Sequence, residues 1–344
     1  MNTNFLGLLV MLSGLLLLEE NSLAANPTHI QQLLKTKQCP GCDLRGANLE
    51  KAKLKEANLA RADLRNANLK KANLSRANLK QANLSGAQLE STNLANSDLS
   101  KANLRAANLH KANLNHSRLV ESDLADADIS KATLGSAFLY GANLAKVIAK
   151  KTIFNLANLS TSNFSQANLE RASLRGANLS KANLEQADLS AADLSIWFDW
   201  THEHSSYVHV TDLSGANLKN ATLVNANLYY SILDESNLTS ADLSGAKLVQ
   251  TSLISANLSN VNFNETNLKG ADLINSILEG ANFNMARLSK NDFRGSTLSK
   301  AINFEPTNAK KLNLCGVLLP SGVRSLQGCP SLRKNIKLKS EELE

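Results

Sequence analysis

Three of the six histidines gather in the segment 195–210, where they point to a possible metal site. His202 and His204 are two residues apart, so on a strand both side chains would lie on the same side. Asp199, Glu203 and His209 are close to these two histidines in sequence and offer further ligands for zinc or copper. The spacing matches no established metal motif, so a metal site is one of three interpretations of this segment.

The same segment contains both tryptophans, which give the other two interpretations. In one of them, Trp197, Trp200 and Tyr207 contact a partner protein or a ligand. In the other, Trp197, Phe198 and Trp200 plug a gap in the body of the protein and leave the histidines in solvent. Aromatic residues make up only 4% of the chain, so their concentration here marks a candidate site.

The four cysteines form two local pairs, one near each end of the chain. A redox C-x-x-C motif belongs to a βαβ unit, which this sequence does not predict, and a zinc site would need all four cysteines together. We therefore expect the disulfides Cys39–Cys42 and Cys315–Cys329. Free thiols are the main alternative, and a redox or metal role is the second.

No residue pattern typical of an enzyme is present. The sequence shows no nucleophile with a neighbouring base, no phosphate-binding glycine loop and no paired carboxylates in an identifiable pocket. We therefore expect a non-catalytic protein without a cofactor or a small-molecule substrate.

An apolar residue recurs at every fifth position through most of the chain. From Leu44 to Leu194 each fifth residue is Leu, Ile or Phe except Ala149, and from Leu213 to Leu298 every fifth residue is Leu or Phe. The residue two positions earlier is small, and the residue directly before the apolar centre is usually Asn or Asp. This period fits neither a helix nor a strand, so it predicts a solenoid of short stacked units.

The pattern A-[N/D]-L-x-x resembles the pentapeptide-repeat family, and the resemblance covers about 43–300. It implies an all-β fold, a right-handed four-sided β-helix in which four units make one coil, with about 12 coils. The apolar centre and the small residue point inward, and the other three residues point outward. We expect two arrays, 43–194 and 213–300, separated by an interruption over 195–212. The interruption is one irregular coil with a single deletion, a loop, or a joint between two rods.

The amino-terminal end carries a predicted targeting segment and a predicted cap. Residues 1–25 contain an apolar run and then small residues, which predict a cleaved secretory signal peptide and no transmembrane span in the mature chain. Residues 26–42 form the cap, with a helix over 27–37 that begins at Asn26 and Pro27. Such caps cover the core and the open strand edges at a solenoid end.

The carboxy-terminal end is predicted to form an irregular cap over 301–332, followed by a charged tail over 333–344. The repeat frame slips at 301–304. We expect the following apolar residues to form the lid: Leu312, Leu314, Leu318, Leu319, Val323 and Leu326.

Positive charge follows one column of the repeat. If four units make a coil, every twentieth residue lies on one edge, and six of the eight positions from 51 to 191 in that column are basic. The basic residues are Lys51, Lys71, Lys111, Lys131, Lys151 and Arg171. Like charges that close repel, so this stripe is either a binding surface for an anionic partner or a solvated edge that keeps rods apart.

The charge of the chain disfavours two functions, gyrase binding by DNA mimicry and nucleic-acid binding. Quinolone-resistance members of the resembled family are acidic rods that mimic DNA and bind gyrase, whereas this chain has a net charge of +7. The sequence also disfavours nucleic-acid binding, because the basic stripe has no interleaved aromatic residues for base stacking.

The segment 33–44 resembles the lead-in of cyanobacterial and chloroplast-lumenal members. That resemblance implies export to the periplasm or the thylakoid lumen. We therefore expect a rigid exported scaffold that binds a protein, one with an acidic surface if it contacts the basic stripe. Gyrase binding and polyanion binding are the alternatives.

Overall fold

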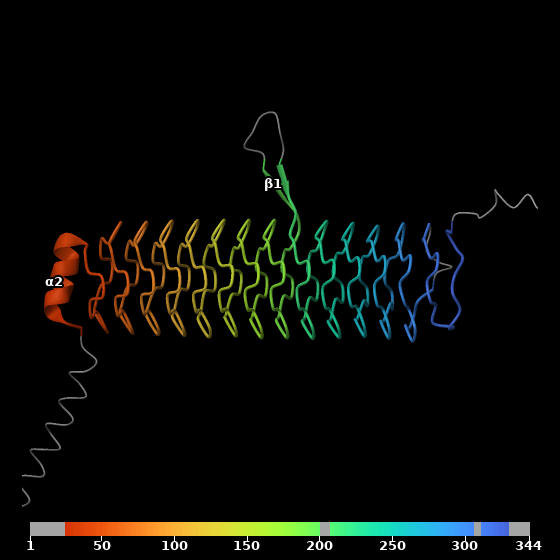
Figure 1. Ribbon diagram of the computed structural model, residues 1–344, viewed down its shortest axis with the longest axis horizontal. Coiled ribbons are helices and arrows are strands. Elements are labelled where there is room, and N and C mark those ends of the chain that lie inside the picture. Colours follow the sequence, from red (N-terminus) through yellow and green to blue (C-terminus); the bar gives the residue numbers. More distant parts are fainter. Residues whose placement is uncertain (1–24, 200–206, 306–310, 330–344) are drawn as a thin grey trace, which may run out of the picture.

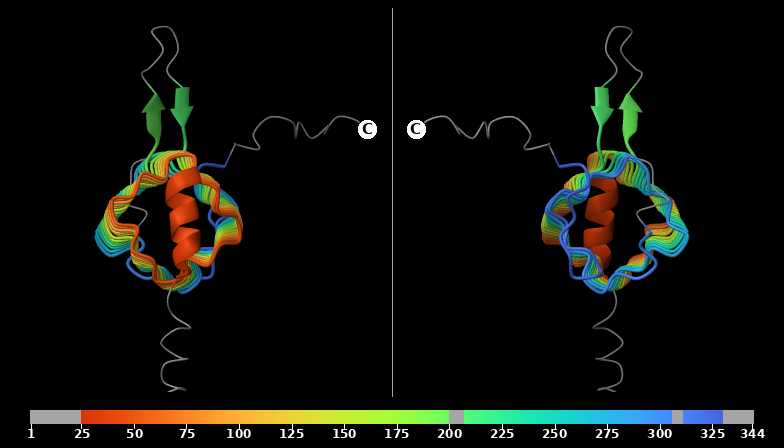
Figure 2. Two further views of the ribbon diagram at one scale, coloured as in Figure 1. Left: turned by 90° about the vertical axis from the view of Figure 1, so that its left-hand side faces the viewer. Right: turned by 90° about the vertical axis from the view of Figure 1, so that its right-hand side faces the viewer.

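The protein is a straight rod of stacked coils, as the computed structural model shows for residues 25–199, 207–305 and 311–329 (Figure 1). Parallel bridges join each outward Asn or Asp to the residue twenty positions later, as in Asn48 to Asn68 and Asn68 to Gln88. Four units of five residues therefore make one coil, and the coils stack around a common axis (Figure 2). The predicted four-sided β-helix is confirmed.

Each five-residue unit makes one side and one corner of a coil. The N–H of Leu49 donates to the carbonyl of Asn68 at 2.7 Å, which joins neighbouring coils, and the N–H of Ala52 donates back to Leu49 at 3.0 Å, which closes the corner. The second residue after the centre takes a positive φ in all but one unit of the two arrays, for example 58° at Lys51. The side chain before the centre caps the turn, since Asn48 Oδ1 accepts from the N–H of Glu50.

The core is a set of inward ladders. The centres from Leu54 to Leu278 are 0–1% exposed, and the small residue of nearly every unit, such as Ala57 and Ala216, is buried beside them. Each buried Leu contributes roughly 1.5–3 kcal/mol before its entropy cost. The sequence pattern therefore places nearly every apolar side chain of the two arrays in one continuous core.

Helix α2, Pro27–Thr36, lies across the open end of the first coil (Figure 2). Its first turn is capped by Asn26, whose side chain accepts from the N–H of Thr28, and Leu33 is fully buried against the coil. Cys39 and Cys42 are disulfide-bonded directly after this helix. None of the helices in the described part of the chain is long and apolar enough to span a membrane.

The far end is less completely covered. The predicted frame slip is present, because Asp292 pairs with Asn313, a step of twenty-one residues instead of twenty. Leu312 and Leu314 are buried, and Cys315 is disulfide-bonded to Cys329. The predicted lid is wrong in part: Val323 and Leu326 are 62% and 82% exposed, because the chain there turns back over one edge.

One short sheet projects from the rod. Strands β1, Trp197–Asp199, and β2, Tyr207–His209, pair antiparallel and extend away from the coils (Figure 1). All of the predicted signal peptide, 1–25, except residue 25 lies outside the described residues, as do the predicted charged tail, 333–344, and Trp200, His202 and His204.

Candidate functional site

The hairpin is an insertion at one corner of an otherwise regular coil. Asn158 pairs with Asn178 twenty residues later, but Asn178 pairs with Asp212, a step of thirty-four. The additional fourteen residues are 197–210, and the coil resumes on the far side in the same register. The irregular-coil and joint alternatives are therefore wrong, and the loop alternative is correct.

Backbone conformation marks the point where the chain leaves the coil. Within the described arrays, the second residue after each repeat centre has a positive φ at every unit except the one that ends in Ile196. Ile196 does not take a positive φ, and the chain continues outward into β1 instead of turning the corner.

Thr211 closes the base of the insertion. Its hydroxyl is fully buried, accepts from the N–H of Gly176 at 2.8 Å and lies 2.8 Å from the carbonyl oxygen of Ser195, to which it donates. These bonds join the residue at which the chain leaves the coil, the residue at which it returns, and the coil below. The hairpin consequently starts from a fixed position on the rod.

The inner side of the hairpin packs on the preceding coil. Trp197 and His209 are opposite each other in register, and a Cβ atom at Gly176 would lie 2.9 Å from the Cβ of each. The guanidinium of Arg175 stacks over the Trp197 ring, 5.1 Å from its centroid, and donates to the carbonyl of Ile196 at 3.2 Å. Glycine is required here because only a residue without a side chain permits this approach.

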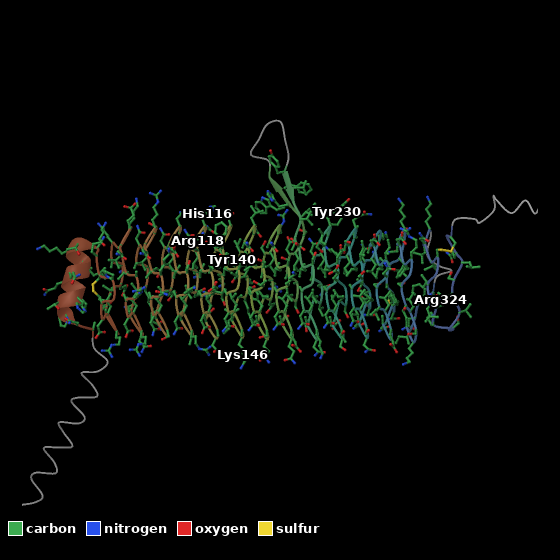
Figure 3. All side chains as sticks on the ribbon, viewed as in Figure 1. His116, Arg118, Tyr140, Lys146, Tyr230 and Arg324 are labelled. Atoms are coloured by element: carbon green, nitrogen blue, oxygen red, sulfur yellow. A yellow bond between two sulfur atoms is a disulfide. The ribbon has the colours of Figure 1, made fainter. Side chains whose placement is uncertain are left out.

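Other aromatic and apolar side chains at the hairpin remain in contact with solvent. Phe198, Tyr207 and Val208 are 38%, 57% and 49% exposed. On the next coil, Tyr229 and Tyr230 are 39% and 42% exposed and stack edge to face with ring centroids 4.5 Å apart. Figure 3 shows Tyr230 at the base of the hairpin. The predicted plug is wrong for Phe198, because the segment points away from the core.

We call this group the hairpin site. It is made of Arg175, Trp197, Phe198, Tyr207, Val208, Tyr229 and Tyr230. Three of the four tyrosines of the chain belong to it. Clusters of partly exposed aromatic residues with an arginine are typical of protein contact surfaces.

The metal interpretation stays a prediction. His202 and His204 lie outside the described residues, and His209 is exposed on β2 opposite Trp197. In the described segments, no three His, Cys, Asp or Glu side chains gather in an arrangement that could hold a metal ion.

The six basic residues predicted to share an edge do so. The N–H of each donates to the carbonyl one coil further on, as from Lys51 to Lys70 at 2.9 Å and from Lys131 to Lys150 at 2.9 Å. All six side chains are exposed. We call this edge the basic ridge, composed of Lys51, Lys71, Lys111, Lys131, Lys151 and Arg171.

Carboxylates neutralise only the ends of the ridge. Lys51 pairs with Glu50 at 3.5 Å and Arg171 with Glu170 at 3.7 Å. Among the described residues the other four ridge lysines have no ion-pair partner. Lys70 and Lys150, which precede ridge lysines, add two further positive charges to the same corner, although Lys150 is paired with Glu170 at 2.9 Å.

Sequence reasoning identified Trp197 and Tyr207 but missed Arg175, Tyr229 and Tyr230. These three lie on the coils beside the insertion, and their role depends on the stacking of coils around it. One signal was available in the sequence. Ile196 occupies the repeat position that Gly176 fills one coil earlier, and the spacing from Leu194 to the next repeat centre is irregular.

The repeat matches a known protein-family model. The family model for pentapeptide repeats matches residues 42–81, 82–119, 122–160, 157–195, 211–239, 231–273 and 266–302. HetL, a pentapeptide repeat protein involved in heterocyst differentiation regulation in Nostoc sp. strain PCC 7120, is 30% identical, with 74% of this chain and 91% of that chain covered and a TM-score of 0.26. Comparison with curated proteins finds no match.

Two further solved structures are similar. A pentapeptide repeat protein from the Arabidopsis thaliana thylakoid lumen is 26% identical, with 34% of this chain and 68% of that chain covered and a TM-score of 0.27. The pentapeptide repeat protein Rfr23 from the cyanobacterium Cyanothece 51142 is 25% identical, with 41% and 90% covered and a TM-score of 0.24.

Proposed function

Because the chain belongs to the pentapeptide-repeat family, we propose that it is a non-catalytic exported scaffold that binds a partner protein through its hairpin site. The observation that carries this proposal is the insertion of residues 197–210 into a coil whose register is otherwise unchanged. The described side chains of this insertion, at 197, 198 and 207–210, lie outside the core, and ordering a segment of this kind costs chain entropy. A contact outside the rod accounts for them.

The composition of the hairpin site favours a protein partner. The partly exposed rings of Phe198 and Tyr230 offer apolar area that becomes buried when a second surface covers it. Arg175 and Trp197 support the base of the hairpin, so the contact residues are held in place before binding.

Export is supported by two independent features. The amino-terminal apolar run, Phe5–Leu18, is followed by small residues in the order expected of a signal peptide. Both cysteine pairs are disulfide-bonded, and such bonds persist in oxidising compartments such as the periplasm. A bacterial periplasm or a thylakoid lumen fits both features.

The binding proposal is tested by photo-crosslinking in the native cell. A photoreactive phenylalanine analogue replaces Tyr230, and in a matched control it replaces Tyr140, which is 40% exposed on the same rod away from the hairpin. We expect a defined adduct from position 230 and none from position 140. Equal labelling at both positions, or none at 230, would contradict the proposal.

A deletion variant provides the second arm of this test. Removal of 197–210 together with Ile196→Asn restores an uninterrupted repeat, Asp193-Leu194-Ser195-Asn-Thr211-Asp212-Leu213. We expect this variant to melt as cooperatively as the unmodified protein and to lose the adduct at position 230. An adduct that survives the deletion would show that the hairpin is not the contact.

Export is tested separately by cell fractionation and intact mass. We expect a chain that starts at Ala25 or Asn26 and is about 4 Da lighter before reduction, since each disulfide removes two hydrogens. A full-length, thiol-bearing protein in the cytosol would contradict export.

A further inference from the structure

We propose that the basic ridge is a docking surface for an anionic lipid membrane, on which the rod lies along its edge. The inference goes beyond the protein contact at the hairpin site and uses a different part of the molecule. It rests on the straightness of the ridge, its unpaired charge and its position relative to the hairpin.

The ridge presents its charges in one line. Consecutive members are separated by one coil, since each N–H donates to the next coil along, including Ser91, which fills the single uncharged position and donates to the carbonyl of His110. At roughly 4.8 Å per coil, the line from Lys51 to Arg171 is about 30 Å long. The rod holds these charges in place, so no chain ordering is needed on binding.

The charge on the ridge is largely free to interact. Within the described residues Lys71, Lys111, Lys131 and Lys151 have no carboxylate partner, and all four are exposed. Repulsion between neighbouring cations is relieved when an anionic surface approaches. Groups of four to eight Lys or Arg are typical of binding to anionic lipid headgroups.

The shape of the edge favours a flat partner. A straight convex corner touches a plane along its whole length, so all ridge cations reach a membrane surface together. The same corner has no groove to enclose a single polymer chain, which would contact the cations from one side only. Ile148 and Ile153 are 44% and 40% exposed on the two faces that meet at the corner beside Lys150 and Lys151. Exposed apolar residues beside lysines are typical of contact with the membrane interface.

The hairpin would stay accessible in this orientation. The ridge column passes through Ser190 and Ala191, and the hairpin leaves the coil at Ser195 and Ile196, one side of the coil further on. The hairpin is therefore about a quarter-turn from the ridge around the rod axis. A rod lying on the ridge would extend its hairpin along the membrane, where the hairpin can meet a second protein.

The test measures binding of the full chain to lipid vesicles by sedimentation. One set of vesicles is phosphatidylcholine alone, and the other contains phosphatidylglycerol as well. Insertion of the amino-terminal apolar run needs no anionic lipid, so the neutral vesicles measure that contribution. We expect a clear preference for the anionic vesicles that weakens as salt is added, because salt screens exposed charges.

Two matched variants assign the binding to the ridge. The ridge variant replaces Lys71, Lys111, Lys131 and Lys151 with Gln, a residue that occupies the same repeat slot at Gln81 and Gln166 with φ of 58°. The control variant replaces four exposed lysines on other edges, namely Lys146, Lys181, Lys219 and Lys269, with Gln. Both lose the same charge.

We expect the ridge variant to lose about tenfold or more of its partitioning onto anionic vesicles and the control variant to lose much less. Equal losses in the two variants, or no preference of the unmodified protein for anionic lipid, would overturn the proposal. Ridge-dependent binding to a soluble acidic polysaccharide without vesicle binding would also overturn it. Binding of the unmodified protein to anionic vesicles that does not weaken with added salt would overturn the proposal even if a variant fails to fold.

Discussion

The hydroxyl of Thr211 lies 2.8 Å from the carbonyl oxygen of Ser195, although sixteen residues separate the two in sequence. This bond closes the loop formed by the hairpin at the surface of the rod. The same hydroxyl accepts from the N–H of Gly176 on the preceding coil at 2.8 Å. One buried oxygen thus attaches the hairpin to the coils and allows the repeat to resume in register.

We expect Thr211→Val to destabilise the protein by about 0.5–1.5 kcal/mol, because the bonds of the hydroxyl are lost while the N–H of Gly176 keeps its bond to the carbonyl of Ser195 at 3.2 Å. Thr152→Val is the matched control. Thr152 is equally buried, but its hydroxyl bonds only to the carbonyl of Ile129. Chemical denaturation of the two variants measures the difference. A loss at Thr211 no larger than that at Thr152 would show that the closure of the hairpin adds nothing to stability.

The approach of the hairpin to Gly176 gives a second prediction. Gly176→Ala introduces a Cβ that would lie 2.9 Å from the Cβ atoms of Trp197 and His209, so the hairpin must move or the rod must strain. We expect a loss of stability together with a change in Trp197 fluorescence, because the ring would shift from beneath Arg175.

Gly141→Ala separates this clash from backbone strain. Gly141 has a φ of 68°, close to the 65° of Gly176, but a Cβ there would meet only the Cγ of Glu121 at 3.5 Å. The two variants share the cost of placing alanine at positive φ, which is roughly 1 kcal/mol. Equal stability in the two variants, with unchanged fluorescence, would contradict close packing of the hairpin.

The course of the rod could be predicted from sequence because each unit interacts with the same neighbours. The spacing from Leu44 to Leu194 determines both the inward ladder and the edge that Lys51 and Lys151 share. The insertion could not be predicted in this way. Nineteen residues from Leu194 to Leu213 fit one short coil as well as one five-residue unit with fourteen residues added.

Only the stacking of coils distinguishes these two solutions. The bridge from Asn178 to Asp212 shows that the repeat resumes after a single unit. The stacking of Arg175 on Trp197 depends on that choice, since Arg175 belongs to the coil beneath the insertion. The exposure of Val323 and Leu326 was missed for a related reason: beyond the last regular coil no period restricts which side of the chain is buried.

The amino-terminal end should show a pH-dependent stability. Arg45 donates to both carboxylate oxygens of Asp43 at 2.8 Å, and this hydrogen bonding lowers the pKa of Asp43 below its ordinary value of 3.8. A carboxyl with a lowered pKa in the folded state stabilises the fold above 3.8, and that stabilisation is lost as the pH falls through the folded-state pKa. We expect Asp43→Asn to cost less than about 1 kcal/mol at neutral pH and nothing in strong acid.

Asp272→Asn should change the stability at neutral pH in the opposite direction, which makes it a useful control. Burial raises the pKa of Asp272, and the nearby carboxylates of Asp292 and Asp234 raise it further. The charged form is therefore disfavoured in the folded protein, and its cost appears as the pH rises through the raised pKa. Denaturation at neutral and acid pH should show Asp272→Asn as stabilising at neutral pH only. The same sign for both variants would refute this account.

A ladder of amide side chains crosses the insertion without a break and gives the last prediction. Asn183 donates to Asn163 Oδ1 at 3.2 Å and accepts from Asn217 at 3.1 Å, although thirty-four residues separate Asn183 from Asn217. Asn183→Asp removes the donor and places a carboxylate oxygen against Asn163 Oδ1. We expect a loss of about 1–2 kcal/mol at neutral pH, which diminishes when the new carboxyl is protonated.

Asn158→Asp is the matched control, because Asn158 Oδ1 accepts from Ser160 N–H and Oγ–H, and a carboxylate accepts both bonds equally well. Its bridge partners on the two adjacent coils, Phe138 and Asn178, carry no charge. Urea denaturation of both variants at neutral and acid pH measures the effect. Because the ladder joins coils on either side of the hairpin, a loss confined to Asn183→Asp would show that side-chain bonding holds the two arrays together as one rod. Equal losses would assign the cost to the added charge alone.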